Sequence, residues 1–302
     1  MKSKNNSAKI AYSEPEDFFP KALRKKYQLG EYAEEKAEKM DERTKIRLEL
    51  DPELLPKTVE LFALHKDEEL PAYDLATALV GCDRTANMPR CLFDFIVGLY
   101  EKAIAEGNDD AMNDLGTLYY NGRGCNQDFT KALYYYEMAF RHGNRQAAEN
   151  LGYCYYYGRS IPADYEKAFH YFALGAFEGN LISLYKIGDL YQNGYYVQKN
   201  LSEAFHIYEH CMNSITDESA PLVAGPVFLR LGNAFLEGLG TDVNVTRALI
   251  CFQKAEMFLY DMVAGGDTMY KKSWCAAIEG QERARELLAS ALPKQEWRDE
   301  PI

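Results

Sequence analysis

The sequence has no long hydrophobic run. Nowhere in its 302 positions do 18 apolar residues follow one another, whereas a helix that crosses a bilayer needs about 20. The first residues are polar and charged, without the apolar stretch of a secretory signal. The seven cysteines form no CxxC pair, and an odd number of separate thiols is typical of a reducing compartment. We therefore expect a cytoplasmic protein with neither a signal peptide nor a membrane span.

Positive charge is also scarce. The chain has 46 acidic and 34 basic residues, a formal charge of −12. Residues 1–60 contain 13 of each sign, so the whole acidic excess lies beyond residue 60. Nucleic acids and anionic membranes bind surfaces that neutralise phosphates. We therefore expect neither as a partner, whereas a basic protein partner remains possible.

A pattern recurs four times, at steps of 36, 36 and 44 residues. Each copy has an aliphatic residue followed by glycine, an aromatic residue three positions later, an alanine, and a second aromatic residue four positions after the alanine. In chain order these are Gly116, Tyr119, Ala132 and Tyr136; Gly152, Tyr155, Ala168 and Phe172; Gly188, Tyr191, Ala204 and Tyr208; and Gly232, Phe235, Ala248 and Phe252. A fixed period of this length predicts stacked repeats rather than a globular fold.

Each recurring position has a physical reason in a pair of antiparallel helices. Apolar residues within 109–120 lie on one face of a helix. A mid-helix glycine such as Gly116 costs about 1 kcal/mol relative to alanine, so its recurrence predicts a close approach of the backbone that Gly152→Leu would prevent. Gly122 is expected to end the first helix in a left-handed cap. The second helix is expected to begin at a side-chain cap in every copy: Asp128, Asp164, Asn200 and Asn244.

This pattern resembles the Sel-one-like repeat (SLR) family of the tetratricopeptide superfamily. The most specific stretch runs from Gly143-Asn144 through Leu151-Gly152 to Gly158, and the resemblance extends over residues 107–266. It implies an all-α fold, a right-handed α-α superhelix of helix-turn-helix repeats. It also implies an adaptor that binds a protein or peptide partner, with no shared catalytic residues. From the residues themselves we expect neither a metal nor a cofactor.

The repeats divide the chain into segments. A charged arm is expected first, disordered at its start and then helical over residues 32–50. A degenerate repeat and four full repeats are expected to follow the arm. The array is expected to end in a cap of two short segments around Gly280. Eight extra residues between Ile215 and Leu231 predict a bend or a longer loop in the fourth repeat. The expected segments are 1–60, 61–106, 107–142, 143–178, 179–214, 215–266 and 267–302.

Positions that differ between copies are expected to be accessible. In related arrays the first helix lines the concave groove. The positions of this helix that differ between copies carry aromatic, amide and charged side chains, a combination that suits an extended peptide. Substituting Tyr153, Tyr156 and Arg230 should then leave stability nearly unchanged. The predicted binding residues are Asp114, Asn150, Lys186 and Arg230; Thr117, Tyr153, Asp189 and Asn233; and Tyr120, Tyr156 and Gln192.

Other interpretations are weaker. The pair His206 and His210 followed by Cys211 offers metal ligands one turn apart, but these positions fall in helix columns that favour surface or packing roles. Cys125, Cys154 and Cys251 share core columns and are expected to be buried. The alternative to an adaptor is a hydrolase-type enzyme with an unrecognised site. A third possibility is that the arm of residues 1–60 occupies the groove.

Overall fold

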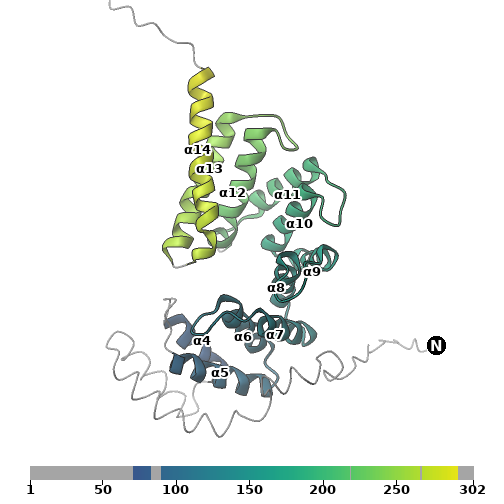
Figure 1. Ribbon diagram of the computed structural model, residues 1–302, viewed down its shortest axis with the longest axis vertical. Helices are drawn as coiled ribbons and strands as arrows, with labels where there is room; N and C mark the ends of the chain where they lie inside the picture. The colour runs from purple at the N-terminus through teal and green to yellow at the C-terminus, as the bar shows by residue number, and fades with distance from the viewer. Residues whose placement is uncertain (1–70, 83–89, 218, 266, 292–302) are drawn as a thin grey trace, which may run out of the picture.

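The computed structural model describes residues 71–82, 90–217, 219–265 and 267–291 (Figure 1). The predictions for the arm of residues 1–60, including its helix over 32–50, lie outside these residues. Within them the regular structure is helical throughout, as the sequence predicts. No helix in the described ranges is long and apolar enough to cross a membrane.

Eleven helices make up the described part of the chain, and five antiparallel pairs are followed by a closing helix (Figure 1). The pairs are α4 (Ala72–Cys82) with α5 (Arg90–Ala105), α6 (Asp109–Asn121) with α7 (Phe129–Arg141), α8 (Gln146–Tyr157) with α9 (Tyr165–Phe177), α10 (Leu181–Asn193) with α11 (Leu201–Ser214), and α12 (Ala220–Glu237) with α13 (Val245–Ala264). A short 3-10 turn, η2 (Thr268–Tyr270), leads into α14 (Lys271–Ala291).

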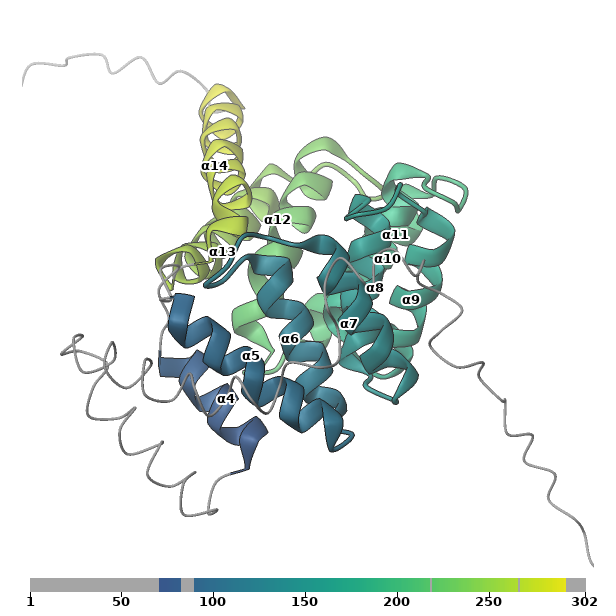
Figure 2. The same cartoon turned by 60° about the horizontal axis from the view of Figure 1, so that its bottom comes forward.

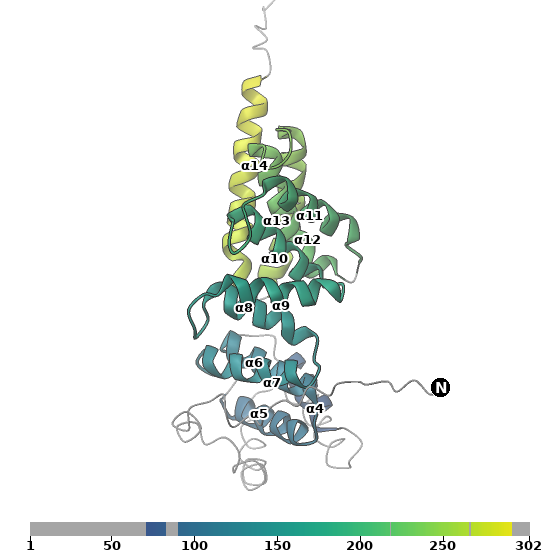
Figure 3. The same ribbon diagram turned by 90° about the vertical axis from the view of Figure 1, so that its right-hand side faces the viewer.

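The pairs stack on one another along a curved array (Figure 3). The array forms an open arc, and its C-terminal end, α13 and α14, comes round toward α4 (Figure 1). The first helices α6, α8 and α10 lie on the hollow side of the arc, and the second helices α7, α9 and α11 lie outside (Figure 2). The predicted all-α superhelix is confirmed.

An aromatic ring of the second helix packs directly on each recurring glycine of the first. A methyl group at Gly152 would lie 2.5 Å from the Phe172 ring, and one at Gly188 would lie 2.5 Å from Tyr208. The corresponding distances at the other two glycines are 2.8 Å and 2.6 Å. The predicted close approach is confirmed, although the approaching group is a ring rather than the backbone.

The predicted helix ends are confirmed as well. Gly122 closes α6 with a left-handed φ of 67°, and its N–H donates to the Leu118 carbonyl. The Asp128 carboxylate accepts from two backbone N–H groups at the start of α7. Asp164, Asn200 and Asn244 cap α9, α11 and α13 in the same way. These caps fix where each turn begins, and so keep successive pairs in register.

Most of the eight extra residues of the fourth repeat lengthen helix α12 at its N-terminal end. Helix α12 has 18 residues and α13 has 20, whereas α10 has 13 and α11 has 14. Helix α11 ends at Ser214 and α12 begins at Ala220, so the connecting loop spans residues 215–219, whereas the loop between α9 and α10 spans only residues 178–180. The predicted longer loop is confirmed, although most of the extra residues are in α12. Pro226 sits inside α12 and leaves it continuous.

The C-terminal cap also differs from its prediction. One continuous helix, α14, replaces the two expected segments, because Gly280 is a packing glycine and not a turn. A methyl group there would lie 2.6 Å from the Phe252 ring, which already packs on Gly232 from the other side. The outer surface of α14 is polar and exposes charged side chains, among them Lys272, Glu279 and Glu282.

The glycine contact can be tested with a matched pair of substitutions. Gly152→Ala and Gly98→Ala gain the same helix propensity, but a methyl group at Gly98 meets nothing within 4 Å. We expect Gly152→Ala to be less stable than Gly98→Ala by about 1–3 kcal/mol, because of overpacking against Phe172. Urea unfolding of both variants measures the difference, and equal stabilities would show that the ring yields freely.

Candidate interaction surface

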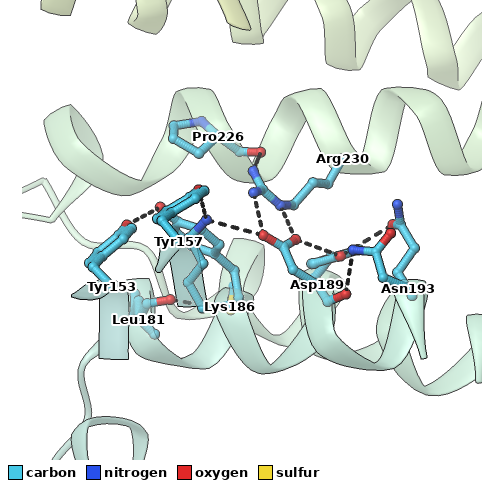
Figure 4. Close-up of polar contacts among 12 residues, drawn as sticks. Tyr153, Tyr157, Leu181, Lys186, Asp189, Asn193, Pro226 and Arg230 are labelled. Atoms are coloured by element: carbon cyan, nitrogen blue, oxygen red, sulfur yellow. Dashed lines mark hydrogen bonds and ion pairs between the residues drawn. The ribbon is translucent and has the colours of Figure 1, made fainter. Parts of the chain in front are cut away.

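Three successive first helices bring polar side chains together (Figure 4). Helix α8 contributes Tyr153 and Tyr157, α10 contributes Lys186 and Asp189, and α12 contributes Arg230. We call these five residues the tyrosine–charge cluster. Its members lie on helices from three different repeats, so the cluster exists only when the repeats are stacked.

Asp189 is the centre of this cluster. Its Oδ1 atom accepts from Arg230 Nε at 2.5 Å and from the Tyr208 hydroxyl at 2.9 Å. Its Oδ2 atom accepts from Arg230 Nη2 at 2.6 Å and from Lys186 Nζ at 3.3 Å. The Arg230 pair is bidentate, the strongest geometry available to these groups. It joins the third repeat to the fourth.

Lys186 lies within a group of aromatic rings. Its Nζ atom is 5.1 to 5.6 Å from the ring centres of Tyr153, Tyr156, Tyr157 and Tyr185. It also donates to the Tyr157 hydroxyl at 2.9 Å. Cation–π attraction and two hydrogen bonds therefore hold an ammonium group whose side chain is only 5% exposed.

Burial and pairing with cations shift the pKa values of the carboxylates in opposite directions. Burial alone would raise the pKa of Asp189, but the charge and hydrogen bonds of Arg230, with help from Lys186, hold that pKa below its ordinary value. Nearby on α8, burial raises the pKa of Glu149, although the amides of Asn180 and Gln146 donate to it. Asp189 is therefore the fixed negative charge of the cluster.

Several predicted binding residues are less accessible than expected. Lys186 and Asp189 are buried, so the inference that a varying position must be accessible is wrong for both. The residues at these two positions differ between copies because in each copy the residue pairs with different neighbours. Tyr153 and Arg230 are partly buried, and Arg230 carries the bidentate pair. The expectation that changing Arg230 leaves stability unaffected must therefore be replaced.

The remaining predicted residues lie along the same first helices. In the first two repeats, Asp114 accepts from the Tyr73 hydroxyl at 3.2 Å, and Asn150 donates to Asn113 at 2.8 Å. Thr117 accepts from Tyr136, and Gln192 from Tyr208. The Tyr120 and Tyr156 rings pack edge-on against residues of the second helices, Phe129 and Tyr165. Asn233 is exposed.

Sequence reasoning missed Tyr157, the most accessible aromatic residue of the cluster. The residue is 47% exposed. It belongs to a column that ends each first helix, together with Asn121, Asn193 and Glu237, and all four are exposed. The variation within this column is visible in the sequence and could have identified it.

A second missed signal links the two helices of a repeat. Where the packing ring is a tyrosine, the first helix supplies an oxygen acceptor: Thr117 for Tyr136 and Asp189 for Tyr208. Where the ring is Phe172, the partner is the Tyr153 ring, packed edge-on at 5.7 Å. The two residues of each pair are 19 positions apart in each copy. The sequence therefore contains the correlation between the packing ring and its partner on the first helix.

Other candidate chemistry is dispersed. His206 and His210 are exposed, whereas Cys211 is buried and directs its sulfur at the Leu181 carbonyl. The described residues contain no group of three side chains that could hold a metal ion. Cys154 and Cys251 are buried as predicted, but Cys125 is only partly buried. Burial raises the pKa of the Cys154 thiol to about 12, which makes it a poor nucleophile at neutral pH.

Removing one partner of the bidentate pair should destabilise the fold. Arg230→Met leaves Asp189 buried without its main counter-charge, and we expect the free energy of unfolding to fall by about 3 kcal/mol. Arg145 is the matched control, since it pairs with Glu178 at 2.7 Å but its side chain is 76% exposed. Arg145→Met should change stability by less than about 1 kcal/mol. Chemical denaturation compares the two, and similar losses would contradict a structural role for Arg230.

The two buried carboxylates should give opposite pH dependences. The folded-state pKa of Asp189 is lowered from 3.8, so as the pH falls this carboxylate takes up a proton in the unfolded chain before it does so in the folded protein. The stability advantage of the original chain over Asp189→Asn should therefore shrink as the pH falls below about 4. The folded-state pKa of Glu149 is raised from 4.5, so the folded protein favours the protonated carboxyl more than the unfolded chain does. The stability of the original chain relative to Glu149→Gln should therefore fall as the pH rises through this folded-state pKa. Denaturation between acid and neutral pH measures both slopes, and slopes of the same sign would refute the assignment.

Comparisons with known proteins agree with this architecture. The family model of the Sel1 repeat matches residues 109–144, 145–180, 181–209 and 229–257. No curated protein matches the chain. Two similar solved structures are a Sel1 repeat protein from Oxalobacter formigenes (20% identity, 64% of this chain and 78% of that one, TM-score 0.46) and a protective antigen of uropathogenic Escherichia coli with an SLR fold (18% identity, 88% and 56%, TM-score 0.52).

The chain thus spans 56% of the antigen's length, and at 18% identity the likeness concerns the fold alone. The four matched segments overlap the four helix pairs from α6 to α13. They also contain the four recurring glycines and the rings packed on them. The chain therefore contains four Sel1 repeats.

Proposed function

We propose that this protein is a scaffold that binds an extended segment of a partner protein on the hollow side of its arc, centred on the tyrosine–charge cluster. Sel1-repeat proteins are generally protein–protein interaction scaffolds and are typically non-catalytic. The partner is a protein rather than a nucleic acid, because the chain carries a net charge of −12.

The observation that carries the proposal is the state of Tyr157. Nearly half of its side chain is exposed, yet its hydroxyl is fixed by Lys186 and its ring stacks on Tyr153 at 5.9 Å. A rigid, exposed tyrosine loses little conformational entropy when it binds a ligand. Tyrosines in such settings are frequent centres of binding energy at interfaces.

The surroundings of Tyr157 suit a peptide. Asn150 lies on the same helix as Tyr157, α8, and Asn233 lies on α12; both carry amide groups, which can pair with peptide backbone. Two predicted residues of the first repeat, Asp114 and Thr117, extend the polar strip toward α4, where Tyr73 donates a hydrogen bond to Asp114. Together they offer a strip that follows the arc.

A peptide selection with matched variants tests the proposal. Random peptides displayed on phage are selected on the full chain, and synthetic versions are titrated by fluorescence anisotropy. We expect Tyr157→Ala to weaken binding at least about tenfold, as for an aromatic centre of binding energy. The control is Tyr260→Ala, because Tyr260 is a tyrosine of similar exposure, 55%, on the second helix α13.

Two results would argue against the hollow side. Selected peptides could bind Tyr157→Ala as tightly as the original chain, or they could depend on Tyr260 instead. Failure to select any peptide would equally oppose the recognition of an extended segment. Thermal unfolding of both variants checks that each remains folded.

A further inference from the structure

Resting on the proposed function, we infer that the segment bound at the tyrosine–charge cluster presents one carboxylate, the side chain of a glutamate or aspartate, to Tyr157 and Arg230. The cluster has a surplus of hydrogen-bond donors and a surplus of positive charge, both at its accessible edge. A ligand that supplies one acceptor with one negative charge satisfies both.

The surplus of donors follows from the hydrogen bonds. The carboxylate of Asp189 accepts from Arg230 twice, from Tyr208 and from Lys186, which occupies all four of its acceptor positions. Arg230 uses a third N–H group on the Pro226 carbonyl, which leaves two of its five. Tyr157 accepts from Lys186, and its own hydroxyl proton has no acceptor among the described residues.

The surplus of charge follows from the pairing. Lys186 and Arg230 share a single carboxylate, that of Asp189. Glu149 is the other acidic group nearby, but its Oε2 atom accepts from two amides, and it forms no ion pair with Lys186 or Arg230. A buried excess of positive charge is costly unless it is paired, so a carboxylate from outside is favoured at this point.

The exposure of the side chains determines which groups of the cluster can contact a ligand. Lys186 is nearly covered, whereas the Arg230 side chain is 21% exposed and Tyr157 is about half exposed. A ligand carboxylate therefore meets the phenol and the guanidinium, the two groups with unused donors. Because the chain as a whole is acidic, repulsion disfavours a polyacidic segment. The fitting ligand has a single carboxylate within an otherwise uncharged, apolar or aromatic stretch.

Peptide pools with one fixed residue test this inference. Three pools carry Glu, Gln or Lys at the central position and random uncharged residues elsewhere, and each is titrated against the full chain. We expect the Glu pool to bind about tenfold more tightly than the Gln pool, the contribution of a charge-assisted hydrogen bond. Added salt should reduce this advantage. Tyr157→Phe, which removes only the hydroxyl, should reduce it too, whereas the control Tyr260→Phe should preserve it.

The outcomes separate the two proposals. If the Gln or Lys pool binds as tightly as the Glu pool and binding still requires the Tyr157 ring, the carboxylate inference is wrong and the peptide-binding function stands. If no pool binds, both are wrong. The comparison of Glu with Gln changes only the peptide, so it remains decisive even if a protein variant folds poorly.

Discussion

The contact between an aromatic ring and a glycine holds this fold together. In each Sel1 repeat, the second helix places a ring against the recurring glycine of the first helix, so close that a methyl group on the glycine would clash with it. The ring is buried as a result, and its hydrophobic surface supplies much of the cohesion of the pair. Because the contact recurs in all four copies, the helix pairs have similar geometry and can stack in a regular array.

The polar chemistry of the hollow side depends on the same contact. The Tyr208 ring lies on Gly188, and this position brings its hydroxyl to Asp189, the next residue along α10. Asp189 then holds Arg230 of the following repeat and Lys186 of its own. A packing contact within one repeat thus positions an ion pair between two repeats, and that ion pair fixes the ring cluster around Lys186.

The sequence is sufficient to predict the features that repeat. The recurring glycines, the Asp and Asn caps, and the helix boundaries all follow from local physics that acts identically in each copy. Features that occur once were not predicted: α12 grew longer, and Gly280 was misread as a turn. The burial of Lys186 and Asp189 was also missed, because variation between copies indicates accessibility only when neighbouring columns do not vary with it. Here they do, as the pairs Thr117 with Tyr136 and Asp189 with Tyr208 demonstrate.

The position of Gly280 has a consequence for how such an array can grow. Helix α14 occupies the surface of α13 on which a further repeat would have to stack, and it faces outward with charged side chains. The Phe252 ring is in close contact with a glycine of α12, Gly232, and with a glycine of α14, Gly280. Additional repeats could therefore be gained in evolution, or by design, only by duplication upstream of this terminal unit, and α12 to α14 would be inherited together as a fixed end piece.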